Sequence, residues 1–453
     1  MNTIVIVIII LLLIFLLFWL IRNDFSYQSN ITSSPQPPTE APTEAPTEAP
    51  TEAPTEAPTE APTQPPTQAP TEAPTQPPTQ APTEAPTQVP TQVPTPTTLP
   101  PLKSAVKDEL ILLGITQDQI LQNTITIQQN LKIIEEENKK QREKEIRDKD
   151  VPQTNYAANP FIVYPRAEFL KLFTGVIYPK GIPKATPPNE YQVKTFTGIP
   201  PNKVRWDTNE NRIGKNCMLP VGNQGKCGSC WAWSANVVME AAINIAGGNA
   251  EGISVNHALN CVKECSNCQG ACLGCRGGFP AYVYTYANNN KGAQSTVSNP
   301  YLSNSSIACN SINIKFDIVK GIGFRPDLKC VEVSPLGMNN FCEYRTTDLY
   351  IPNSEQTVVI QQMLNEYGPF TICINADSLT FLSQPYNISL PGGIINHAVV
   401  LIGYEQRKDV SGRDSLYWVI QNSWGKSWGD KGCFYAQVKT SYIAAPESVV
   451  IKL

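Results

Sequence analysis

The segment 224–233, QGKCGSCWAW, places a glutamine amide and two cysteines directly before an apolar run. A thiol is a nucleophile only as a thiolate, and its pKa falls at a helix N-terminus beside a protonatable base. Apolar residues at helical spacing predict a helix over 231–246, which Gly247-Gly248 would end. Cys230 would then lie in the first turn, where the helix dipole favours a negative charge. A buried structural cysteine is the alternative on this segment alone.

The search for a base is short, because the chain has only two histidines. His397 opens an apolar run that predicts a strand, and 416–421 predicts a returning strand that ends at Asn422. A hairpin of these strands would make His397 and Asn422 neighbours. The asparagine carbonyl could hold the imidazole in one tautomer, and Trp424 could keep water away. His257, in a predicted short helix, is interpreted as a surface or satisfied histidine.

Two more segments accompany these, Cys275-Arg-Gly-Gly278 and NSWGKSWGDKG at 422–432. Together the four segments resemble the papain-like cysteine peptidases, and the cathepsin B and cathepsin X branches in particular. The resemblance covers about residues 200–453, in the family's order of Cys, His and Asn. It implies an α+β papain-like fold, with a helical lobe, a β-barrel-like lobe and a cleft between them. It implies no cofactor and no metal.

The resemblance also implies a role for each matching residue. Cys230 would be the nucleophile, His397 its base and Asn422 the residue that orients the imidazole. The Gln224 side chain and the Cys230 backbone N–H would stabilise the oxyanion. The implied substrate-binding residues are Gly277, Gly278, Ala398, Trp424 and Glu447. The two glycines would let an extended peptide pair with the backbone, although a plain turn is the alternative. Glu447 would give an anionic pocket that admits Arg as well as bulky apolar side chains.

Cysteine usage indicates an oxidising compartment. Setting Cys230 aside leaves 12 of the 13 cysteines, enough for six disulfides. The resemblance suggests that Cys227 pairs with Cys275, while the other pairings stay open. A zinc site is the alternative for the cluster between 261 and 275, but its two CxxC pairs are closer than zinc modules usually allow. The sequons at Asn30, Asn304 and Asn387 agree with glycosylation in such a compartment.

The N-terminal part predicts a membrane tether. Ile4–Ile21 has no polar side chain and would be about 27 Å long as a helix, enough to cross a bilayer. We interpret 1–24 as an uncleaved signal anchor, with the catalytic domain on the lumenal, extracellular or particle-surface side; a cleaved signal is the alternative. Residues 35–101 repeat Pro-Thr-Glu-Ala variants, which predict an extended stalk, either mucin-like or a plain spacer.

Residues 103–200 are expected to be a helical, propeptide-like region before the peptidase domain at 201–453. Apolar residues recur every seven positions from Leu113 to Ile134, which predicts an amphipathic helix region that packs on the enzyme or self-associates. Aromatic residues after position 160 could dock on the enzyme. From its position, the region would be an inhibitor of the enzyme's own cleft, so that cleavage between about 150 and 205 raises activity.

These features predict a cysteine endopeptidase that acts on polypeptides. A net charge of −4 gives no basis for nucleic-acid binding. Cathepsins B and X trim C-termini with a histidine that holds the substrate carboxylate, and neither histidine of this chain is placed for that. Two alternatives remain. One is a stalked surface attachment or binding protein with an inactive papain-like head, and the other is a transpeptidase or ligase that uses the same acyl-enzyme.

Overall fold

The structure is a computed structural model that describes residues 101–147, 154–177, 191–262, 272–304, 309, 311–327, 329–333, 348–409 and 411–453. The predicted anchor at 1–24 and the stalk, up to residue 100, lie outside these residues. Across the described ranges, no helix is long and apolar enough to cross a membrane.

The region before the peptidase domain is helical. Its elements are α2 (Ser104–Leu112), α3 (Gln117–Gln122), α4 (Thr124–Arg147), η1 (Pro160–Val163) and α5 (Arg166–Phe173). The seven-residue pattern does not run along one helix, because the chain turns at Gly114, which has a φ of +82° that suits glycine. Thr116 then starts α3 with a capping box to Gln119. The amphipathic helix region predicted from the heptad therefore consists of three helices.

These helices share a small apolar core of their own. Ile120, Ile127 and Ile134 are buried at heptad spacing, as the pattern predicted. They pack with Ile162 of η1 and with Phe381 of the peptidase domain. The prediction left open whether this face packs on the following domain or self-associates, and the contact with Phe381 shows that it packs on the domain at 201–453.

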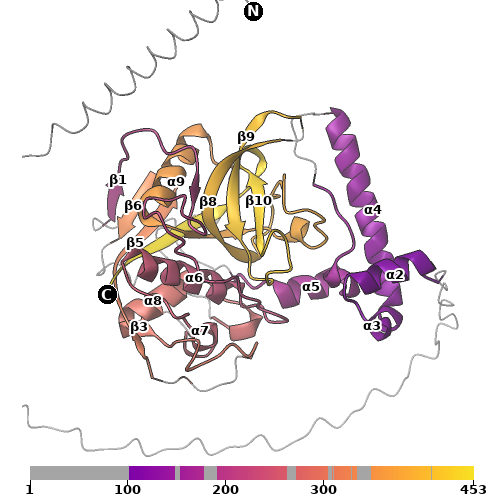
Figure 1. Ribbon diagram of the computed structural model, residues 1–453, viewed down its shortest axis with the longest axis horizontal. Coiled ribbons are helices and arrows are strands. Elements are labelled where there is room, and N and C mark those ends of the chain that lie inside the picture. Colours follow the sequence, from indigo (N-terminus) through magenta and orange to yellow (C-terminus); the bar gives the residue numbers. More distant parts are fainter. Residues whose placement is uncertain are drawn as a thin grey trace, which may run out of the picture. The chain divides into compact units, whose positions relative to one another are not determined.

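A helical lobe carries the segment around Cys230. Its elements are α6 (Cys230–Ile245), α7 (Val255–Cys261), η2 (Gly274–Arg276), α8 (Pro280–Asn290), β3 (Gly292–Ala293) and β4 (Ile314–Lys315). Most of α6 is buried, because its apolar residues face the sheet on one side and the other helices of the lobe on the other. In Figure 1, α6 lies against strands of the yellow sheet, with α7 and α8 on its other side.

The second lobe is a nine-stranded sheet with the order β1-β6-β5-β11-β7-β8-β9-β10, and β2 pairs with β8 (Figure 1). The strands are β1 (Tyr191–Lys194), β2 (Val204–Arg205), β5 (Asp317–Arg325), β6 (Lys329–Val333), β7 (Phe370–Ile374), β8 (His397–Lys408), β9 (Asp414–Gln421), β10 (Cys433–Gln437) and β11 (Ala444–Lys452). The helical elements here are α9 (Ser354–Tyr367), η4 (Asp377–Leu379) and η5 (Val438–Thr440). All residues of β7 and β10 are buried, which agrees with their mainly apolar sequences, FTICI and CFYAQ.

Two disulfides lie within the described part of the chain. Cys227 is bonded to Cys275, and Cys261 to Cys309. Cys217, Cys330 and Cys433 are buried thiols without a disulfide partner. Twelve cysteines would be enough for six disulfides, but these three do not take part in one. The sulfurs of Cys261 and Cys309 lie within 4.8 Å of a ring nitrogen of His257, but a disulfide already joins them.

Candidate active site

Cys230 is the first residue of α6, directly after the N-cap Ser229. Its thiol lies at the backbone N–H groups of Ala398, Trp231 and Gly175, all of which favour the thiolate. The side chain is fully buried, however, and burial dominates, raising the pKa of the Cys230 thiol to about 12. Cys230 is thus at the predicted helix start. It is a neutral thiol in this structure, which we call the closed form because Gly175 of the N-terminal region lies at the thiol.

His397 and Asn422 meet across the edge of the sheet. Antiparallel pairing of β8 with β9 brings the start of one strand beside the end of the other. His397 Nε2 lies 2.8 Å from Asn422 Oδ1. The Ser423 backbone N–H donates to the same oxygen, which identifies it as the carbonyl. Nε2 therefore carries the proton and Nδ1 keeps a lone pair.

The free nitrogen of His397 is the one a base would use. Among the described residues, Nδ1 has no hydrogen-bond partner. The next residue, Ala398, has its N–H at the Cys230 thiol, so the start of β8 adjoins the nucleophile position. Burial lowers the pKa of His397 to about 4, although the bond to Asn422 opposes the shift. The indole of Trp424 covers the imidazole with ring centroids 5.0 Å apart.

Gln224 is fully buried between the two lobes. Its side-chain oxygen accepts a hydrogen bond from Ser423 Oγ at 2.6 Å. The amide nitrogen is thereby the other end of the side chain, and it donates to the backbone oxygens of Phe173 at 3.1 Å and of Cys227 at 2.9 Å. A backbone carbonyl from the N-terminal region thus occupies one donor of the implied oxyanion hole.

The segment Phe173–Ile177 follows the site with its backbone. Gly278 N–H donates to Gly175 O at 2.9 Å, and Ile177 N–H donates to Gly278 O at 2.8 Å. These bonds form a parallel bridge between Val176 and Gly278. On the other side, the N–H groups of Gly175 and Val176 share Asn396 O at 3.0 Å. The segment therefore lies between the glycine pair and the residue before His397.

Glycines make this close approach possible. A Cβ on Gly175 would lie 2.1 Å from Gly228 O, and a Cβ on Gly278 would lie 2.6 Å from the Trp231 ring. Gly277 has a φ of +120°, and a side chain there would meet Ile177. No side chain fits at these positions without moving backbone or a buried ring. The predicted role of Gly277 and Gly278 as a backbone platform agrees with this geometry.

Aromatic side chains anchor the N-terminal region beside the site. Phe161 and Phe169 pack edge-on against Trp424, with ring centroids 5.5 and 5.3 Å apart. The Trp424 indole N–H donates to Phe173 O at 3.0 Å. Lys226 lies over the ring of Tyr164. These contacts cover Trp424, whose side chain is only 4% exposed.

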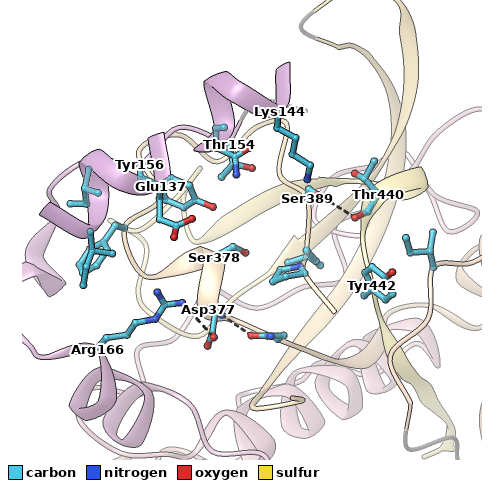
Figure 2. Close-up of a pocket in the computed structure, with 18 of the residues that line it drawn as sticks. Glu137, Lys144, Thr154, Tyr156, Arg166, Asp377, Ser378, Ser389, Thr440 and Tyr442 are labelled. Atoms are coloured by element: carbon cyan, nitrogen blue, oxygen red, sulfur yellow. Dashed lines mark hydrogen bonds and ion pairs between the residues drawn. The ribbon is translucent and has the colours of Figure 1, made fainter. Parts of the chain in front are cut away.

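A second attachment lies on the sheet lobe. The backbone at Asn155–Ala157 pairs with Phe381 and Ser383, and the Asn159 side chain donates to Thr380 O at 2.8 Å. Beside it is a cavity of about 550 Å³, into which Glu137 and Lys144 of α4 point (Figure 2). The Arg166–Asp377 ion pair, 3.4 Å long, lies at its edge. None of Cys230, His397 or Asn422 lines this cavity. It is therefore a gap between the N-terminal helices and the sheet lobe, and not the candidate active site.

The remaining predicted residues lie away from Cys230, His397 and Asn422, or outside the residues that the structure describes. Glu447 is in β11 opposite Thr371 and is buried, and its role in a substrate pocket stays a prediction. His257 is buried in the helical lobe and accepts a hydrogen bond from Gln294 N–H, as a satisfied histidine would. Asn304 is exposed, Asn387 is half-buried, and Asn30 lies outside the described residues.

Sequence reasoning missed three features of the site. Ser423 orients the Gln224 amide, Tyr301 holds its backbone, and the part of the N-terminal region that reaches Cys230 is Phe173–Ile177. Ser423 was visible as the neighbour of Asn422 and could have been found from the hairpin alone. The cleft segment acts through backbone atoms, which leave no side-chain pattern in a sequence.

The chain is similar to known proteins over this part. A family model described as "Papain family cysteine protease" matches residues 201–451. Pro-cathepsin H of Mus musculus is 27% identical over 241 residues, which cover 52% of this chain and 60% of that protein. Cysteine proteinase 1 of Dictyostelium discoideum is 26% identical, covering 62% and 74%. The chain thus spans less than two thirds of the length of pro-cathepsin H. These relatives do not confirm the predicted cathepsin B or X branch.

Solved structures share the fold beyond the matched domain. The digestive procathepsin L2 proteinase from Tenebrio molitor larval midgut has a TM-score of 0.52 and 21% identity, and covers 76% of this chain and 98% of its own. The recombinant stem bromelain precursor has a TM-score of 0.51 and 20% identity, with coverages of 76% and 97%. A share of 76% is more than residues 201–451 alone, so the common fold includes part of the preceding region. The expected papain-like α+β fold is confirmed.

Proposed function

The chain belongs to the papain family of cysteine proteases, and from that premise we propose that it is a cysteine endopeptidase made as a zymogen. One observation carries the proposal. His397 is held by Asn422 with its other nitrogen free, and Ala398 next to it has its N–H at the Cys230 thiol. A base, the residue that orients it and a thiol at a helix start are the parts that nucleophilic acyl transfer requires.

The chemistry follows from these positions. Nδ1 of His397 takes the proton of Cys230, and the sulfur attacks the peptide carbonyl carbon. The oxygen of the tetrahedral intermediate accepts hydrogen bonds from the Gln224 amide and the Cys230 backbone N–H. The imidazolium then protonates the leaving amine, which breaks the C–N bond and leaves an acyl-enzyme. Water, deprotonated by the same imidazole, releases the acid and restores the thiol.

The zymogen part of the proposal rests on Phe173–Ile177. This segment occupies Gly278, the Gln224 amide and the surroundings of Cys230 with its own backbone. A substrate needs the same groups, so it cannot bind until the segment leaves. Val176 pairs with Gly278 in the parallel orientation, and the residue at the Cys230 thiol is Gly175. The segment therefore presents no side chain to the thiol. We infer that cleavage or release of the region before about residue 200 activates the enzyme.

Finer points of the function are also proposals. Endopeptidase action is favoured because His257 is buried in the helical lobe and so cannot hold a substrate carboxylate in the cleft. Three further proposals rest on the sequence alone. They are the substrate-binding roles of Ala398, Trp424 and Glu447, the relationship to the cathepsin B or X branch, and the membrane tether through residues 4–21.

Product analysis tests the endopeptidase proposal. Processed protein would be incubated with a long unstructured polypeptide, and the fragments followed by mass spectrometry over time. Internal cuts should give large fragments first. Dipeptides released from one end as the main early product would contradict endopeptidase action while leaving the cysteine mechanism intact. Products joined to an added amine acceptor would instead indicate a transpeptidase.

A further inference from the structure

The backbone of Gln224 is held as firmly as its side chain. Its N–H donates to Ser423 O at 2.8 Å, which ties it to the sheet lobe. Its carbonyl accepts from the Tyr301 hydroxyl at 2.8 Å and from Ser303 Oγ at 3.3 Å, which ties it to the helical lobe. The next residue, Gly225, has a φ of +55°, and a glycine restricts the neighbouring backbone less than other residues do. The position of Gln224 therefore depends on these partners.

The Tyr301 hydroxyl has a second partner, Ser229. The two oxygens are 2.7 Å apart. Because Tyr301 donates its proton to Gln224, the proton in this second contact is that of Ser229, whose hydroxyl also lies 3.3 Å from the more distant acceptor Cys227 O. Ser229 is the N-cap of α6 and directly precedes Cys230. One hydroxyl group thus joins the residue that supplies the oxyanion donor to the residue beside the nucleophile.

Tyr301 is itself well placed to act as a support. Its ring packs edge-on against Trp233 of α6, with centroids 5.1 Å apart. The chain two residues earlier is fixed to α7, because Asn299 O accepts from Ser254 Oγ and Asn299 Oδ1 accepts from Asn256 Nδ2 at 3.1 Å. Ser254, Asn256 and Asn299 are all buried. The hydroxyl is therefore presented from a part of the lobe that does not move easily.

We propose that Tyr301 is a positioning residue, which sets the distance between the Gln224 amide and the Cys230 sulfur by holding Gln224 O and Ser229 Oγ together. The proposal rests on the proposed peptidase function. Oxyanion donors act only when they lie about 2.7–3.1 Å from the oxygen in the transition state. A shift of a few tenths of an ångström in the loop therefore reduces the stabilisation of the transition state more than it reduces substrate binding.

The test uses Tyr301→Phe, which removes the hydroxyl and keeps the ring on Trp233. In processed protein, kcat should fall about tenfold, as expected for the loss of one buried hydrogen bond, with KM changed less than twofold. Gln224→Ala alone should lower kcat by about 10²–10³. Adding Tyr301→Phe to Gln224→Ala should cost no more than a further twofold, because Tyr301 acts through Gln224. Tyr286→Phe is the matched control, since its hydroxyl lies near His257 and Cys309, and it should keep wild-type kcat.

Two results would overturn the proposal. One is wild-type kcat in Tyr301→Phe. The other is the same tenfold loss in both the wild-type and Gln224→Ala backgrounds, which would indicate a general structural role. Protein labelled with ¹⁵N-glutamine gives a readout that needs no turnover. The Gln224 side-chain amide pair, assigned by its loss in Gln224→Ala, should be sharp in wild type and broadened or shifted in Tyr301→Phe. If the Gln224 amide signals are unchanged in Tyr301→Phe, the positioning role is contradicted, whether or not the protein is active. If the signals change but the wild-type protein shows no turnover, only the peptidase function is contradicted.

Discussion

The Gln224 side-chain amide donates a hydrogen bond to the backbone oxygen of Phe173, 3.1 Å away. The donor that would stabilise an oxyanion is thus occupied by a carbonyl of the chain's own N-terminal region. The same region places Gly175 at the Cys230 thiol and pairs with Gly278. The proposed inhibition would therefore come from backbone atoms in the positions that the proposed mechanism assigns to a substrate.

Gly175→Ala should open the closed form. Its Cβ would lie 2.1 Å from Gly228 O, a clash with backbone that no rotamer can relieve. We expect alkylation of Cys230 by iodoacetamide in the unprocessed protein to become at least tenfold faster. Gly392→Ala is the control, because its φ is not positive and its Cβ would make only ordinary contacts with the Tyr442 ring, 3.5–3.6 Å away. Equal alkylation rates in the two variants would show that Gly175 does not keep the segment in place.

The closed form should lose stability in acid through His397. Burial lowers its pKa to about 4, whereas an imidazole in the unfolded chain titrates near its ordinary value of 6.5. Between these values the unfolded state binds a proton that the closed state does not, so the free energy of unfolding falls as pH falls from about 6.5 to about 4. Thermal melts of Cys230→Ala at several pH values measure this effect. If the slope in this range is unchanged in Cys230→Ala/His397→Gln, His397 is not its source.

Glu240 should act in the opposite direction. It is buried in α6, where it accepts a hydrogen bond from the Ile253 N–H at 2.6 Å. Burial raises its pKa to about 8, against an ordinary 4.5. The folded state keeps a proton that the unfolded state releases, so stability is lost as pH rises from about 4.5 to about 8. Glu240→Gln keeps the acceptor oxygen and should be more stable than wild type at pH 8 but not at pH 4.5. The same Tm difference at both pH values would rule out titration of Glu240.

Some parts of the site could be predicted from the sequence and others could not. The His397–Asn422 contact could be predicted because antiparallel strands on either side of a short loop leave little choice of register. The helix at Cys230 was visible from periodicity and the glycines after it. A cleft inhibitor was expected from the position of the region before the domain, but the residues that enter the cleft could not be predicted, since their contacts with Gly278 and Gln224 are long-range and use backbone atoms. The number of disulfides could not be predicted either, because counting cysteines ignores where they lie. Cys217, Cys330 and Cys433 are buried in places where they find no partner.

Glu447 gives a prediction about specificity. It is buried in β11, and the resemblance to the family makes it a candidate for the floor of a substrate pocket. A carboxylate there would attract a cationic side chain, so Glu447→Gln should lower the rate on Arg-Arg peptides relative to Phe-Arg peptides by about tenfold. Fluorogenic peptides of both kinds, measured on the same processed protein, give the ratio. An unchanged ratio with intact turnover would place Glu447 away from the pocket.

The most direct test compares unprocessed and processed protein from residue 103 onward, beside Cys230→Ala, in mild reductant. Burial holds the pKa of Cys230 at about 12 in the closed form, so that form should neither hydrolyse Phe-Arg peptides nor react with iodoacetamide near neutral pH. Limited proteolysis should produce both activities together in the wild type and neither in Cys230→Ala. If correctly folded, processed protein shows no turnover and no alkylation of Cys230, the head is inert. A stalked binding protein then replaces the peptidase as the account of this chain.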